Sequence, residues 1–72
     1  MDWKKQATTI IKVELAKQNI DYSELSKKME NIGIEEDKSN IANKLSRGTF
    51  SFAYALQIFK ALGLKKLNLE DM

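Results

Sequence analysis

Apolar residues recur every three or four positions along four stretches of the chain, which is the spacing of amphipathic helices. The first predicted helix covers residues 2–18, and Asp2 before it is a suitable N-cap. Its apolar positions are Trp3, Ala7, Ile10, Ile11 and Leu15. We expect Trp3 to cover the core or to contact a partner subunit. Glu14 falls on the same face, so it lies at the edge of that face or has a cationic partner.

Two shorter helices are predicted in the middle of the chain. The second starts at Asp21, which forms a capping-box-like pair with Glu24, and ends near Asn31. The third covers residues 38–46 and stops at Gly48, a residue type that commonly ends helices. The large apolar residues of these helices are Leu25 and Met29 in the second, and Ile41 and Leu45 in the third.

The fourth predicted helix covers residues 52–62, with Ser51 as its N-cap and Gly63 as its end. We expect its core face to consist of Phe52, Ala55, Leu56, Ile58, Phe59 and Leu62. Tyr54 falls on the polar side, so it is expected to be exposed. In the tail, residues 64–72, apolar and polar residues alternate, which predicts a short strand or an irregular turn.

The composition favours a single all-α domain over residues 1–72, a compact four-helix unit with a short C-terminal tail. The 72 residues include no Cys, His or Pro. Thiol and imidazole chemistry and Cys/His metal sites are therefore excluded, and we expect no enzyme activity, metal, cofactor or small-molecule substrate. No stretch has the length of a membrane span or a secretory signal, so we expect a cytoplasmic protein without a membrane partner. A homodimer is predicted because so small a core gives limited stability.

The charges separate along the chain although the net charge is only +2. Residues 38–66 include six basic side chains and no acidic one, whereas residues 30–37 include four acidic side chains and no basic one. A local excess of positive charge attracts phosphates. The acidic run 35–37 leaves three alternatives open. The connector folds the acids away, the basic surface is centred on Lys44 and Arg47, or the partner is not a nucleic acid.

The third helix is polar on the side opposite its apolar pair. Ser39, Asn40 and Asn43 have donors and acceptors of the kind that read base edges, while Lys44 and Arg47 suit phosphates. For Arg47 the alternative is a bond to the last helical carbonyls or to a connector acid. For Asn43 the alternative is a solvated helix position.

Two segments are similar to an uncharacterised bacterial family. They are the run Asn43-Lys44-Leu45-Ser46-Arg47-Gly48-Thr49-Phe50 and the preceding connector Ile32-Gly33-Ile34-Glu35-Glu36. The chain resembles domain-of-unknown-function family 6471 from about Trp3 to Gly63. This resemblance implies a helical fold and no particular function.

A more distant resemblance covers residues 21–63. Glu24-Leu25-Ser26 and Ala61-Leu62-Gly63 are similar to the E-L-A and A-L-G segments of the phage-repressor type of helix-turn-helix. This resemblance implies that the third helix enters a DNA groove. The groove-facing residues would be Ser39, Asn40, Asn43 and Lys44, and Tyr22 would take the place of a polar residue that touches phosphate. The connector 31–37 is longer than the usual turn of about 3–4 residues, which leaves the groove-binding pose open.

The sequence therefore predicts a DNA-binding helix-turn-helix domain that binds double-stranded DNA, as a transcriptional regulator or in a related DNA transaction. The residues expected to contact DNA are Tyr22, Lys27, Lys28, Ser39, Asn40, Asn43, Lys44 and Arg47. The alternative is a protein–protein interaction module on the same fold. Its motivation is the acidic run together with the tail leucines, Leu64, Leu67 and Leu69, which could form an exposed apolar patch.

Overall fold

Each of the four helices begins after a side chain that accepts a hydrogen bond from the backbone of its first turn. The computed structural model describes residues 1–67 and 69. Its helices are α1 (Trp3–Lys17), α2 (Tyr22–Asn31), α3 (Lys38–Arg47) and α4 (Phe52–Ala61). The N-caps are Asp2, Asp21, Asp37 and Ser51, which satisfy backbone N–H groups that would otherwise lack partners.

The predicted all-α fold is confirmed, and the helix boundaries agree with the sequence prediction to within one residue. Asn19 and Gly48 adopt the left-handed conformation that ends the first and third helices. The described part of the tail forms no strand, and residues 68 and 70–72 lie outside the described residues. None of the described helices is long and apolar enough to cross a membrane.

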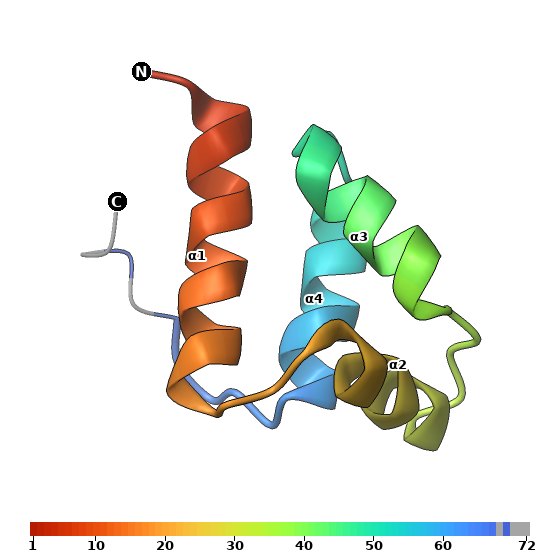
Figure 1. The fold of residues 1–72 in the computed structure, drawn as a ribbon. Helices are drawn as coiled ribbons and strands as arrows, with labels where there is room; N and C mark the ends of the chain where they lie inside the picture. Colours follow the sequence, from red (N-terminus) through yellow and green to blue (C-terminus); the bar gives the residue numbers. More distant parts are fainter. Residues whose placement is uncertain (68, 70–72) are drawn as a thin grey trace.

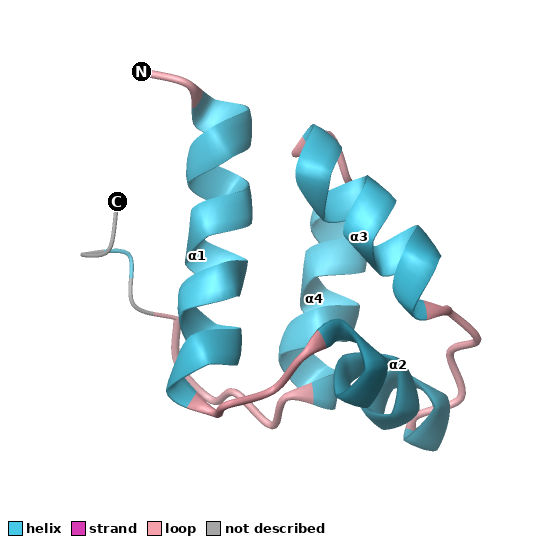
Figure 2. Ribbon diagram, viewed as in Figure 1, coloured by secondary structure: helices cyan, strands magenta, loops and turns pink. Residues whose placement is uncertain are grey.

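The helices surround one core with α2 lying across the end of the other three. In Figure 1, α1 and α4 run in the same direction, α4 lies behind α3, and the tail returns beside α1. Figure 2 shows that loops join all four helices. The six largest fully buried side chains come from every helix: Ile11, Leu25, Met29, Ile41, Leu45 and Ile58.

The structure corrects the predicted orientation of α4. Phe52 and Leu56 were expected in the core, but Phe52 is 72% exposed and Leu56 is 51% exposed. Tyr54 was expected at the surface, but it is buried in the core beside Ile58 and Leu62. The reason is that α4 packs against α2 with the side that bears Tyr54, Ala55 and Ile58, and these residues are buried. A helix that is apolar on nearly all sides does not show which side this is.

Two smaller expectations have mixed outcomes. From the sequence we expect the two isoleucines that flank Gly33 in the connector to pack into the core. Ile34 does so, whereas Ile32 is 38% exposed, so the prediction for Ile32 is wrong. Glu14 is buried and its Oε1 lies 3.6 Å from Nζ of Lys17, which confirms the cationic partner. Trp3 does not cover the core, since it is 65% exposed.

The start of α1 packs closely against the corner between α3 and α4. Thr8 Oγ1 donates a hydrogen bond of 2.5 Å to the Leu45 carbonyl near the end of α3. Gly48 has a φ of 67°, and a β-carbon there would lie 2.5 Å from the Lys4 carbonyl oxygen. The glycine is therefore required for both its backbone conformation and its contact with α1.

We predict that Gly48→Ala lowers the free energy of unfolding by about 2–4 kcal/mol, because it combines left-handed strain with a backbone clash. Gly63→Ala is the matched control. Gly63 has a φ of 71°, and nothing lies within 4 Å of its added β-carbon. The control should lose only about 1 kcal/mol. Urea unfolding of both variants measures the difference, and equal losses would contradict the close packing of α1.

Candidate nucleic-acid interface

The outer face of α3 is polar and free of internal contacts. Ile41 and Leu45 are fully buried and fix the helix on its inner side. Ser39, Asn40 and Asn43 are exposed. Among the described residues, the side chains of these three make no hydrogen bond. The sequence prediction is thus correct in one respect: these side chains share an open face and have unused donors and acceptors.

Arg47 lies where two hollows adjoin at the end of α3. One hollow lies between α3 and the start of α4 and includes Lys44, Thr49 and Gln57. The other lies between α1 and α3 and includes Lys4, Lys5, Lys12 and Arg47. We call this second set of four residues the basic groove. Its one acidic lining residue is Asp2, whose carboxylate accepts hydrogen bonds from the backbone N–H groups of Lys4 and Lys5.

The three lysines of the basic groove were missed by the sequence analysis. Lys4, Thr8 and Lys12 are four residues apart, so they share one side of α1. That spacing was a visible signal. It did not reveal that this side of α1 faces α3, which depends on the hydrogen bond between Thr8 and Leu45 and on the close approach at Gly48.

Lys44 has internal partners. Its Nζ lies 2.7 Å from Oε2 of Glu36 and 4.4 Å from the ring centroid of Tyr54. The Glu36 side chain is only 7% exposed, while the Lys44 side chain is 47% exposed. An ammonium held by a carboxylate and an aromatic face has less to gain from a phosphate than a free lysine has. Lys44 therefore links the connector, α3 and α4.

The acidic connector is folded inward at Glu36, which answers one question left open by the sequence. The backbone of Glu36 also accepts a hydrogen bond of 2.5 Å from Ser26 Oγ, which joins the connector to α2. Asp37 accepts the backbone N–H of Asn40 at 2.8 Å as the N-cap of α3. Glu35 remains exposed. Two of the three acids are therefore engaged in structure.

Tyr54 is buried beneath Lys44 and lies close to Glu36. Burial raises the pKa of its phenol, and the charge and nearness of the Glu36 carboxylate raise this pKa further. The hydroxyl is therefore neutral at any physiological pH. Among the described residues it forms no hydrogen bond of normal geometry. The ring of Phe50 lies against Tyr54 with centroids 6.0 Å apart. The ring of Tyr54 thus forms a cation–π contact with the Lys44 ammonium.

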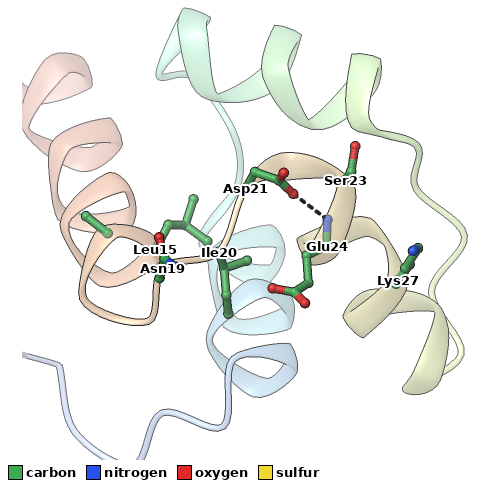
Figure 3. Close-up of a pocket in the computed structure, with 8 residues that line it drawn as sticks. Leu15, Asn19, Ile20, Asp21, Ser23, Glu24 and Lys27 are labelled. Atoms are coloured by element: carbon green, nitrogen blue, oxygen red, sulfur yellow. Dashed lines mark hydrogen bonds between the residues drawn. The ribbon is translucent and has the colours of Figure 1, made fainter.

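The predicted contacts on α2 do not join this surface as one set. Tyr22 is half-buried and packs against the core, and Lys28 is also half-buried. Lys27 lines a separate hollow at the corner between α1 and α2, together with Ile20, Asp21 and Glu24 (Figure 3). That hollow shares no residue with the basic groove.

These features define a small all-α domain whose third helix presents a polar face beside a basic groove. The chain belongs to the family described as Domain of unknown function (DUF6471), whose model matches residues 3–67. This finding confirms the first resemblance. No curated protein and no solved structure matches the chain significantly.

We predict a favourable coupling between Glu36 and Lys44 of about 0.5–1.5 kcal/mol, because one partner is buried and the other is half-exposed. A double-mutant cycle with Glu36→Gln and Lys44→Met, followed by urea unfolding, measures it. The coupling should fall as salt is added. A coupling of zero at low salt would show that Lys44 is free for other partners.

Proposed function

We propose that this domain binds double-stranded DNA, with the outer face of α3 against the base edges and the basic groove against the phosphate backbone. The observation that carries the proposal is the position of four cationic side chains beside a polar helix face that has no internal partners. We further propose that the protein is a transcriptional regulator or acts in a related DNA transaction. The assignment to the helix-turn-helix class is part of this proposal.

The dimensions and side chains of α3 support this role. An α-helix with its side chains is about 10–12 Å in diameter, which fits a major groove about 12 Å wide, and the ten residues of α3 give a length of about 15 Å along it. Asn40 and Asn43 have amides of the kind that form paired hydrogen bonds with adenine. Because Asn is a poor helix former, two of them in a short helix are better explained by recognition than by stability.

The path of the connector also supports a helix-turn-helix arrangement of α2 and α3. The N–H groups of Gly33 and Ile34 donate to the carbonyls of Glu30 and Met29, at 2.9 and 3.0 Å. Part of the long connector is therefore the closing turn of α2. Only residues 34–37 then remain to reach α3, which is close to the usual turn of about 3–4 residues.

The charge distribution favours backbone binding through Arg47 and the lysines of α1. Lys44 contributes less than its sequence position suggests, because Glu36 already neutralises it. Among the connector acids, this pair neutralises Glu36, whereas Asp37 remains exposed at the start of α3. Glu35 is exposed and is not among the residues that line the basic groove.

We predict that affinity for random-sequence duplex DNA falls steeply with salt, because phosphate binding releases counterions. Arg47→Ala and Lys12→Ala should each reduce the slope of log affinity against log salt by about 0.9. Lys60→Ala is the matched control, since Lys60 is exposed on α4 outside the basic groove. Fluorescence anisotropy at several salt concentrations measures the slopes. A flat salt response of the wild type would contradict DNA binding.

We predict that Asn43→Ala relaxes sequence preference while binding to random DNA stays nearly unchanged. The loss at the preferred base should be about 1–3 kcal/mol. Selection from a randomised duplex pool, followed by affinity measurements on the selected and scrambled sites, provides the comparison. An equal loss on both sites would assign Asn43 to backbone contact or to folding instead.

A second candidate function is a protein-interaction module on the same fold. The observation that favours it is the tail, where Leu67 is 37% exposed and Leu69 is 57% exposed. Leu64 of the same segment packs against the core. Substitutions at Leu67 and Leu69 should impair function under this alternative, whereas substitutions at Arg47 should impair it under DNA binding.

A further inference from the structure

An apolar surface lies outside the core, beside a hollow that shares no lining residue with the basic groove. It consists of Trp3 on α1, Phe52 and Leu56 on α4, and Leu67 and Leu69 in the tail, and we call these five residues the apolar strip. Trp3 and Phe52 are the most exposed, at 65% and 72%. Monomeric proteins rarely leave two such rings in water beside further leucines.

The strip borders a shallow hollow between α1 and α4. Its lining includes Ala7, Ile10, Ala55, Phe59 and Leu67, and no charged side chain is among the lining residues. Trp3 and Phe52 are the first residues of α1 and α4. These helices run in the same direction (Figure 1). Phe52 itself lines the hollow, whereas Trp3 is not among its lining residues. Leu67 of the tail lines the hollow as well.

This surface combines two exposed rings with a recess that is lined by apolar side chains and Ser51. A surface of this kind can pair with itself about a two-fold axis, because the rings of each copy then pack against the apolar strip of the other. The absence of charge from the recess disfavours an acidic or basic partner, since such a partner would lose hydration without gaining an ion pair.

The area is consistent with a second copy. Two rings and three leucines at these exposures leave on the order of 500 Å² of apolar surface, given that one aromatic side chain can bury about 150–250 Å². A standard interface buries about 800 Å² on each partner. Pairing through the strip buries on the order of 500 Å² on each partner, or about 1,000 Å² in total, which is near the lower limit of a specific interface, so a weak dimer is expected.

We propose that the apolar strip is the interface of a symmetric homodimer, in which Trp3 and Phe52 of each copy pack against the apolar strip of the other. The strip shares no residue with the basic groove. Pairing therefore leaves the basic groove and the outer face of α3 open in both copies. The proposal stands apart from DNA binding, because the interface forms in the protein alone.

Sedimentation equilibrium of the full chain without DNA, from about 1 μM to about 1 mM, tests the proposal. The wild type should pass from monomer to dimer across this range. Phe52→Asp should weaken the dimer by about tenfold or more, because it places a carboxylate in the centre of an apolar contact. Ile32→Asp is the matched control, since Ile32 is also an exposed apolar residue but lies in the connector.

The emission of Trp3, the only tryptophan of the chain, gives a second readout. It should shift to the blue with rising wild-type concentration and stay constant in Phe52→Asp. Phe52→Ala provides a milder variant if Phe52→Asp unfolds. A wild type that remains monomeric at the highest concentration overturns the proposal. A dimer that Phe52→Asp and Phe52→Ala leave unchanged overturns the assignment of the interface, and capture of a different protein at Phe52 by a monomeric chain overturns the second copy as the occupant.

Discussion

The burial of Ile41 and Leu45 is the contact on which the proposed interface depends. These two side chains are the only large apolar residues of α3, and both are fully buried. They fix the inner side of the helix against the rest of the core. The residues on the outer face of α3 are not needed to fill the core. They can therefore be polar without lowering the stability of the core. A short helix held in this way presents a fixed pattern of donors and acceptors.

The second constraint is electrostatic. The chain holds nearly equal numbers of acids and bases, yet the structure separates their roles. Glu36 and Asp37 act inside the fold, as the partner of Lys44 and as the N-cap of α3. The cations of the basic groove remain without carboxylate partners among the described residues. A modest net charge is thus compatible with a surface that attracts phosphates, because the separation of charge and not its sum sets the local field.

Much of the fold could be predicted from the sequence, because the helix starts and ends are local chemistry. Asp2, Asp21, Ser51 and Gly48 mark boundaries through their own hydrogen bonds or conformations. The orientation of α4 could not be predicted, since apolar residues cover most of its surface, and Phe52 and Tyr54 exchanged their expected places. The exposure of Asn40, Asn43 and Arg47 on α3 could also be predicted from the sequence, because they lie opposite the buried Ile41 and Leu45. Two features could not be predicted: the position of the α1 lysines beside α3, and the ion pair between Lys44 and Glu36. Both depend on tertiary packing, which a local sequence pattern does not reveal.

The most direct test of the account is an amide-resolved NMR titration with duplex DNA at low and at moderate salt. The account predicts salt-sensitive shifts at Asn43 and Arg47 and along the side of α1 that bears Lys4 and Lys12. The core amides and the amide of Lys60 should stay in place. Shifts confined to the tail, or no shifts at low salt, would contradict DNA binding by the outer face of α3.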